Sequence, residues 1–187
     1  MSEITAVALD AMGGDNAPFA MVEGTVNAIN NNPDVKVILV GKEDEVNAEL
    51  SKYTYDKNRI EVFNATEVIE TAEHPVAAIK KKKDSSMVVG LHLLKEGKVD
   101  AFVSAGNSGA LLTGGLGIVG RIRGIERPPF GAIFPVRSGV CLLCDSGANV
   151  DVRASHLVQF AKMGSIYMEH VVGIKNPKVA IVNIGAE

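Results

Sequence analysis

The sequence ITAVALDAMGGDNAP, residues 4–18, decides the fold, because an apolar run passes directly into a polar, glycine-rich segment. Residues 4–11 are mostly apolar and partly β-branched, which is typical of a strand covered on both faces. A simple turn needs only one or two of the residues Gly, Asn and Asp. Residues 10–16 contain two aspartates, two glycines and an asparagine. This excess of polar and flexible residues predicts a binding segment at the end of a buried strand.

The rest of the chain repeats this alternation of short apolar runs with amphipathic segments. Strands are predicted at residues 4–11, 35–41, 59–66, 100–105, 131–136, 139–147 and 178–185. Helices are predicted at residues 18–31, 44–53, 75–95, 106–123 and 154–172. Strands that alternate with helices in this way favour an α/β fold with a largely parallel sheet. The two strands around the turn RSG, at 131–136 and 139–147, are expected to pair with each other.

The composition of the chain limits the classes of protein to which it can belong. The chain has 187 residues, 47% of them hydrophobic, and a formal net charge of -3. We expect one α/β domain over residues 1–187 and no binding of nucleic acid, since the charge gives no electrostatic reason for it. The sequence has no apolar run of roughly 20 residues and no basic start of a secretory signal, so a cytosolic protein is expected. The last predicted strand ends beside Glu187, and we therefore expect the N-terminal part of a longer chain.

Four of the predicted strands end in glycine together with polar side chains. In an open parallel sheet, ligands bind beyond the carboxyl ends of the strands, so these segments predict a polar cleft at one edge. The segment SAGNSGALL offers the best anion site, because glycines there permit close approach of backbone N–H groups that begin a helix. The four segments contain the following residues: Asp10, Gly13, Gly14, Asp15 and Asn16; Ser104, Gly106, Asn107, Ser108 and Gly109; Asp145, Gly147, Asn149 and Asp151; Asn183 and Gly185.

The run IKKKKDSSM adds four consecutive lysines, residues 80–83, followed by Ser85 and Ser86. Four successive helical residues fan around the helix, so only one or two of these lysines could face an anion. The histidines lack metal-ligand spacing, and the sequence contains no G-x-S-x-G elbow, Walker pattern or dinucleotide fingerprint. This pattern favours chemistry in which the substrate supplies its own nucleophile and the protein positions charges. Such a scheme requires no metal and no organic cofactor.

The pair Cys141 and Cys144 forms a lone C-x-x-C inside a predicted strand. Positions three apart on a strand point to opposite faces, and a single pair supplies too few ligands for a structural zinc site. We expect two buried, reduced cysteines.

Five long motifs together resemble one family, the phosphate acyltransferases of bacterial phospholipid synthesis, or PlsX family. The motifs are ALDAMGGDNAP, EVIE…HPVAAIKKKKDSSM, SAGNSGALLTGGLGIVGRIRGIERP, DSGANVD and HLVQFAKMGSIY, and they span nearly the whole chain. The resemblance implies a Rossmann-like three-layer α/β/α fold related to phosphotransacetylases and isopropylmalate dehydrogenases. It also implies conversion of acyl-acyl carrier protein and inorganic phosphate into acyl phosphate and free carrier protein, by a homodimer that associates peripherally with the membrane. A membrane acyltransferase would act downstream.

Residue roles follow from combining the resemblance with the strand ends. The residues expected to act in catalysis are Asp10, Asn16, Lys82, Asn107, Asp145 and Asn149. The residues expected to bind phosphate or substrate are Gly13, Gly14, Lys83, Ser85, Ser86, Ser104, Gly106, Ser108, Gly109 and Gly147. Two alternatives stay open: a phosphotransacetylase-like enzyme acting on coenzyme A thioesters, and a non-catalytic fragment that keeps only a phosphate-binding surface.

Overall fold

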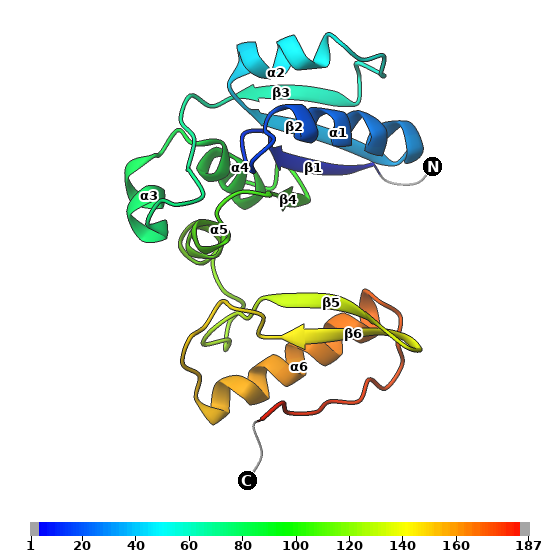
Figure 1. The fold of residues 1–187 in the computed structure, drawn as a ribbon, viewed down its shortest axis with the longest axis vertical. Coiled ribbons are helices and arrows are strands. Elements are labelled where there is room, and N and C mark those ends of the chain that lie inside the picture. The colour runs from blue at the N-terminus through cyan, green and yellow to red at the C-terminus, as the bar shows by residue number, and fades with distance from the viewer. Residues whose placement is uncertain (1–3, 184–187) are drawn as a thin grey trace. The chain divides into compact units, whose positions relative to one another are not determined.

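The computed structural model describes residues 4–183, and the chain divides into two compact units between Gly120 and Arg121. The first unit is an α/β sandwich, and the second combines a β-hairpin with a long helix (Figure 1). The expectation of a single domain stays a prediction. Each unit is considered by itself.

The first unit is built on a parallel sheet of four strands in the order β3-β2-β1-β4. Leu9 of β1 pairs with Leu39 of β2 on one side and with Val103 of β4 on the other. The expected α/β fold with a parallel sheet is confirmed. The elements of this unit are β1 (Thr5–Asp10), α1 (Phe19–Asn31), β2 (Val35–Gly41), α2 (Glu43–Leu50), β3 (Ile60–Asn64), α3 (Pro75–Lys81), α4 (Ser86–Lys95), β4 (Ala101–Val103), α5 (Ser108–Gly114) and the π-helix η1 (Gly115–Val119).

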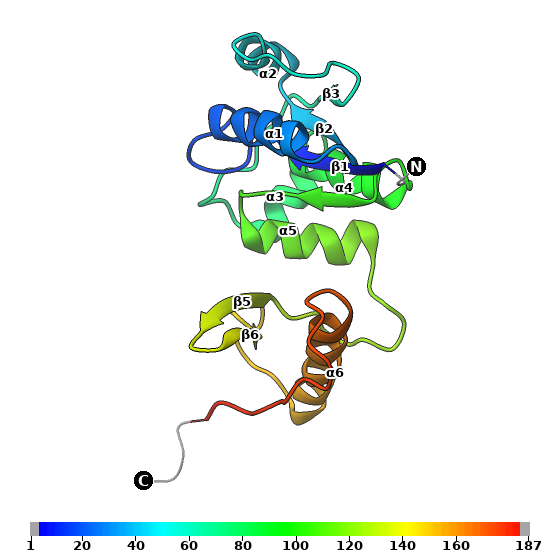
Figure 2. The same cartoon turned by 90° about the vertical axis from the view of Figure 1, so that its right-hand side faces the viewer.

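Helices cover both faces of this sheet, which explains why its strands are apolar without a polar alternation. Val37 and Leu39 of β2 pack in one cluster with α1 and α2, whereas Ile38 and Val40 pack in another with α4. Figure 2 shows α1 and α4 on opposite sides of the strands. A third cluster joins α3, α4 and α5 through residues such as Met87. The ends of the strands therefore lie between packed layers of helices.

Arg59 forms hydrogen bonds with several backbone carbonyls at the edge of the sheet where the strands begin. Its Nη1 donates to the carbonyl of Ile29 at 2.7 Å, its Nε donates to the carbonyl of Val35 at 3.0 Å, and its Nη2 donates to the carbonyl of Asn32. The planar guanidinium thus joins the end of α1 to the start of β2 by a set of charge-assisted hydrogen bonds.

Two predicted helices are shorter than expected. The predicted helix at 75–95 is two helices, α3 and α4, because Ser85 caps α4: its Oγ accepts from the N–H of Val88 and donates to the carbonyl of Lys82 at 2.8 Å. The predicted helix at 106–123 ends at Gly120, whose φ of 99° is outside the helical region and suits glycine. The residues DSS at 84–86 carried the signal for the break, since Asp and Ser favour N-caps.

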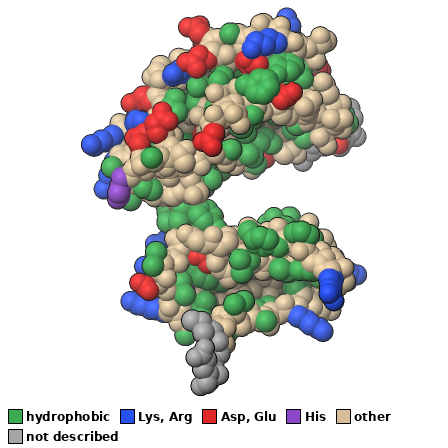
Figure 3. Space-filling model, in the orientation of Figure 1, with side chains coloured by type: hydrophobic (Ala, Val, Ile, Leu, Met, Phe, Trp, Pro, Cys, Tyr) green, Lys and Arg blue, Asp and Glu red, His purple; other side chains and the backbone are tan. Residues whose placement is uncertain are grey.

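The second unit pairs β5 (Gly131–Val136) with β6 (Gly139–Cys144) as an antiparallel hairpin, and α6 (Ala154–His170) packs against β6. The predicted pairing is confirmed. Both cysteines lie on β6 and are free, but the prediction that they are buried was wrong: Cys141 is exposed and Cys144 is half-buried. Among the described residues of this unit two strands form the sheet, and Phe134 of β5 is 46% exposed. Figure 3 shows hydrophobic side chains on the surface of this unit.

The predicted strand at 178–185 does not form where the structure describes it. Residues 178–183 run without regular structure, and Val182 is 88% exposed. A strand needs a neighbour to accept its backbone hydrogen bonds, and no strand pairs with this segment among residues 4–183. Gly185 and the rest of the prediction lie outside the described residues.

Arg59→Lys should destabilise the first unit, because a single ammonium cannot reproduce the forked contacts to three carbonyls. We expect a loss of about 1–3 kcal/mol in the free energy of unfolding, measured by chemical denaturation. The same change at Arg123, an exposed residue of the second unit, is the control and should alter stability little. Equal stability of the Arg59→Lys protein and the wild type would contradict this role.

Candidate functional site

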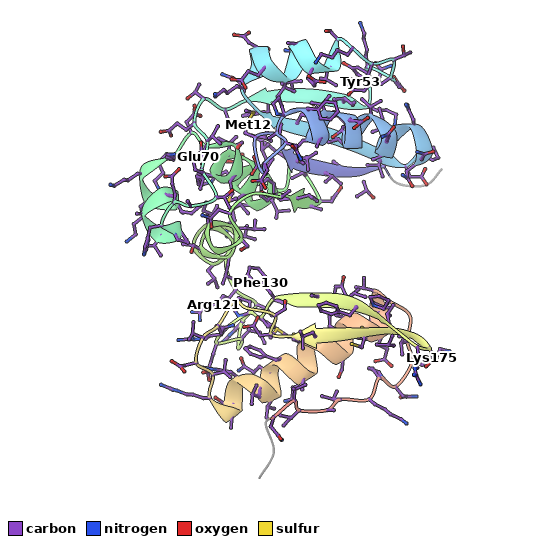
Figure 4. The ribbon with its side chains drawn as sticks, in the orientation of Figure 1. Met12, Tyr53, Glu70, Arg121, Phe130 and Lys175 are labelled. Atoms are coloured by element: carbon purple, nitrogen blue, oxygen red, sulfur yellow. The ribbon has the colours of Figure 1, made fainter. Side chains whose placement is uncertain are left out.

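The first unit reverses its winding at β1, which lies between β2 on one side and β4 on the other. In doubly wound sheets the crevice at such a switch point, beyond the carboxyl ends of the strands, is the usual place for ligands. Figure 4 shows Met12 and Glu70 on the segments that follow β1 and β3. The geometry therefore selects the segments after β1 and β4 as the candidate site.

Asp10 forms the buried centre of this site. The residue is 2% exposed, and its carboxylate accepts hydrogen bonds from the Ser104 hydroxyl at 2.7 Å and from the N–H of Met12 at 3.2 Å. The Ser104 hydroxyl oxygen in turn accepts from the N–H of Gly106 at 3.1 Å. One carboxylate thus fixes the serine, and the serine fixes the first part of the loop after β4.

The loops after β1 and β4 cross at two glycines. A Cβ on Gly13 would lie 2.6 Å from Asp10 Oδ2 and 3.0 Å from the backbone nitrogen of Gly106. A Cβ on Gly106 would lie 3.3 Å from the Cα of Gly13. Gly14, with a φ of 101°, lies against Ala105 of the same crossing. The structure therefore brings together the expected residues Asp10, Gly13, Gly14, Ser104 and Gly106.

The remaining predicted residues of these two loops differ in their accessibility. Asn16 and Ser108 are exposed. Gly109 lies against Pro75, because a Cβ there would approach the proline Cγ to 2.7 Å. Asn107 is 6% exposed and turns into the protein, where its Oδ1 accepts from the N–H of Ala110 at 2.9 Å. The backbone N–H groups of Ser108 and Gly109 open α5, so the helix itself offers them no acceptor.

The lysine run is distributed around the end of α3. Lys82, expected to act in catalysis, pairs instead with the carboxylate of Glu73 and donates to the carbonyl of Val68. The Lys82 hydrogen bond, with another from the N–H of Glu70, lowers the pKa of the Glu73 carboxyl below its ordinary value. Lys83 is exposed and donates to the carbonyl of Ile79 at 3.2 Å. The positive charge of Lys82 is thus already neutralised within the protein.

Ser85 and Ser86, expected to help bind an anion, are 0% and 2% exposed. The Ser85 hydroxyl is occupied by the α4 cap described above. This placement does not favour direct contact of either side chain with a ligand, and their role at the start of α4 is structural.

Asp145, Gly147 and Asn149 lie in the second unit, on the loop after β6. Burial raises the pKa of the Asp145 carboxyl, but hydrogen bonds from the Asn149 side chain and from the N–H groups of Phe130, Ala148 and Asn149 outweigh it and lower the pKa. The backbone N–H groups of Phe130 and Asn149 both approach the carboxylate to 2.7 Å. Asp145 therefore stays ionised and organises this loop, while Asn149 Nδ2 also donates to the carbonyl of Pro128.

Sequence reasoning missed two groups of polar residues. In the first unit these are Glu70, Thr71 and Glu73, which contact Asn107 and Lys82. In the second unit, His156 is 5% exposed and bonds Glu126 at 2.9 Å beside a hollow of about 450 Å³. The segment EVIE…HP indicated the helix that begins at Pro75, but nothing in it placed the first group beside Asn107 and Lys82. Nothing in the sequence placed Glu126 beside His156.

Residues 4–183 contain neither a metal-binding cluster nor a membrane-spanning helix. No three His, Cys, Asp or Glu side chains gather closely enough to hold a metal ion. No helix of the described chain combines the length and the apolar character needed to cross a bilayer.

Comparison with known proteins gives the family. A family profile described as "Fatty acid synthesis protein" matches residues 5–187. The chain belongs to this fatty acid synthesis protein family. Its relatives include a protein named phosphate acyltransferase from Alkaliphilus oremlandii, 53% identical over 181 residues, which are 97% of this chain and 54% of that protein. Another of that name, from Clostridioides difficile, is 52% identical over 97% of this chain and 53% of its own length.

This member of the fatty acid synthesis protein family spans about half the length of the curated relatives it matches. Its fold is similar to that of a phosphotransacetylase from Streptococcus pyogenes, with a TM-score of 0.65, 18% sequence identity, and coverage of 91% of this chain and 55% of that one. The EutD phosphotransacetylase from Staphylococcus aureus has the same TM-score at 17% identity, over 91% and 54% of the two chains. The fold class predicted from the sequence is confirmed by these neighbours.

The crossing of the two loops predicts opposite effects for two glycine-to-alanine changes. Gly13→Ala should destabilise the protein by roughly 1–3 kcal/mol, since its Cβ meets a buried carboxylate and backbone that must shift. Gly24→Ala, inside α1 with open space around it, should stabilise by roughly 0.5–1 kcal/mol. Chemical denaturation of both variants tests this, and a neutral Gly13→Ala would show that the loops do not cross so closely.

Proposed function

We propose that this protein is a phosphate acyltransferase that transfers the acyl group of acyl-acyl carrier protein to inorganic phosphate. The observation that carries the proposal is the identity of 53% over 97% of this chain to a protein of that name. The phosphotransacetylase-like fold and the position of the loops at the switch point support it. Homodimer formation and peripheral membrane contact, which the resemblance implies, and a cytosolic location, which the sequence predicts, belong to the same proposal.

Phosphate is itself the nucleophile in this reaction, so the protein must bind it and hold it against the thioester. A phosphate oxygen attacks the thioester carbonyl carbon, a C–O bond forms and the C–S bond breaks. The phosphate proton passes to the departing thiol sulfur, which leaves acyl phosphate and free carrier protein. Positioning the two substrates supplies much of the rate acceleration, and hydrogen-bond donors directed at the developing oxyanion supply more. No residue of the chain needs to form a covalent intermediate.

The loop after β4 is the proposed phosphate-binding segment. The Gly106 N–H is already engaged by Ser104, so we assign the contact to the backbone N–H groups of Ser108 and Gly109, with the exposed Ser108 hydroxyl beside them. Asp10 acts indirectly, by fixing Ser104 and through it the loop. In the second unit, Asp145 holds the loop that carries Asn149, and both are proposed to orient the acyl donor.

An assay on the full-length protein tests the reaction. With acyl-acyl carrier protein and phosphate, we expect phosphate-dependent release of the carrier thiol and an acyl phosphate that hydroxylamine traps as a hydroxamate. Turnover of acyl coenzyme A in place of the carrier-protein substrate would favour the phosphotransacetylase alternative, which the structural neighbours suggest. Phosphate binding without thiol release would favour a non-catalytic binding protein.

Gly106→Val should weaken phosphate binding. The bulkier side chain would press on Gly13 and on the Ser104 hydroxyl, each 3.3 Å from the position of a Cβ, and would displace the loop. We expect the phosphate dissociation constant, measured by isothermal titration, to rise about ten- to a hundredfold. Gly117→Val is the matched control, because Gly117 lies on η1 with open space around it. Unchanged affinity in a folded Gly106→Val protein would place the anion elsewhere.

A further inference from the structure

The segment of residues 68–74, which connects β3 to α3, is held by polar side chains from two other parts of the first unit. Asn107 reaches it from the loop after β4, and Lys82 reaches it from the end of α3. The segment is itself irregular, so its backbone carbonyls need hydrogen-bond donors from elsewhere. These two side chains supply them.

Asn107 uses its whole amide group for this purpose. Its Nδ2 donates to the carbonyls of Glu70 at 3.3 Å, Thr71 at 3.1 Å and Glu73 at 2.9 Å. Its Oδ1 accepts from the N–H of Ala110 and so caps α5. The side chain is 6% exposed, and a buried amide of this kind is costly to leave unpaired. One residue therefore joins the start of α5 to a loop more than thirty positions earlier in the chain.

Packing provides a second connection between the same two segments. Gly109 lies so close to Pro75 that a Cβ would approach the proline Cγ to 2.7 Å. Ile69, 6% exposed, belongs to the cluster that contains Ala110 of α5. The segment is therefore seated against the beginning of α5 on both sides of the Asn107 contacts.

The same segment also determines where the charge of Lys82 lies. Glu73 Oε1 accepts from the N–H of Glu70 at 2.8 Å and pairs with the Lys82 ammonium, with the two side chains 30% and 28% exposed. Asn107 holds the backbone carbonyl of Glu73. The position of the Glu73 carboxylate therefore follows the position of Asn107. A continuous series of contacts thus runs from the loop after β4 to the lysine run.

We propose that Asn107 is a positioning residue for the candidate site, and that it makes residues 70–73 a third wall of that site beside the loops after β1 and β4. This inference rests on the proposed function. Asn107 does not touch phosphate; its Nδ2 holds the wall, and its Oδ1 caps the helix. The two roles are carried by different atoms of one side chain, so substitutions can separate them.

Asn107→Ser and Asn107→Asp make this separation. Serine and aspartate are both good N-cap residues, so each keeps an acceptor for the N–H of Ala110. Neither has an Nδ2 donor, and aspartate also places a negative charge against three carbonyl oxygens. A residue that served only as a cap would tolerate both changes. A residue that positions the wall would not, and the effect should appear in phosphate binding.

The test uses the full-length protein, with phosphate titrated both in the acyl phosphate assay and by calorimetry. We expect Asn107→Ser and Asn107→Asp to raise the KM and the dissociation constant for phosphate about ten- to a hundredfold, with the larger effect in the aspartate variant. Asn32→Ser is the matched control: its Nδ2 also bonds a backbone carbonyl, but at the end of α1 on the opposite edge of the sheet. That variant should leave both phosphate constants unchanged.

Pro75→Ala removes the proline ring that lies against Gly109 and so loosens the contact between the same wall and α5. This variant provides the test if the Asn107 variants fail to fold. We expect a smaller rise in the phosphate KM. The inference is wrong if the position 107 variants fold and keep the wild-type KM and dissociation constant for phosphate. If those variants do not fold, a wild-type phosphate KM in the Pro75→Ala protein would overturn it. Absence of acyl phosphate formation by the wild type would instead overturn the proposed function, and calorimetry would still decide the role of Asn107.

Discussion

The carboxylate of Asp10 is buried where two loops cross, and the candidate site depends on keeping that carboxylate hydrogen-bonded. Its partners are the Ser104 hydroxyl and the Met12 N–H. Both loops can approach it only because positions 13 and 106 lack a Cβ. The crossing in turn requires β1 and β4 to be neighbours, which the strand order β3-β2-β1-β4 provides. Asp10 and Gly13 therefore act as one structural unit with Ser104 and Gly106, which lie more than ninety positions later in the chain.

Many of the polar side chains that the sequence predicted to act are already bonded to other groups of their own unit. Asn107 is occupied by backbone carbonyls, Lys82 by Glu73, and Asp145 by backbone N–H groups. Side chains of this kind fix the course of a loop, and the donors that we propose for an anion are the backbone N–H groups of Ser108 and Gly109 with the exposed Ser108 hydroxyl beside them. Preorganised backbone donors cost little reorganisation when charge develops, which is the property that oxyanion stabilisation requires.

The strand ends could be predicted from the sequence because burial and turn chemistry are local properties. Asp10, Gly13, Ser104 and Gly106 were expected at one edge of the sheet, and they do touch one another. Residues 70–73 could not be placed in this way, since their contacts with Asn107 depend on how α5 packs beside α3. The role predicted for Lys82 did not match its contacts for a related reason. The sequence shows where a charge lies, but only the tertiary structure shows that Glu73 pairs with Lys82. A strand at 178–185 was predicted from apolar character alone. A strand also needs a partner strand, and none pairs with residues 178–183 in the described part of the chain.

Arg59 and the candidate site lie at opposite ends of the strands. The six residues of β1 separate the two ends by about 20 Å, and effects of changes that far apart are usually additive. Substitutions that strengthen the Arg59 edge can therefore offset the destabilisation that accompanies new side chains at the binding edge. The length of the strands thus lets the contacts of Arg59 act independently of the loops after β1 and β4.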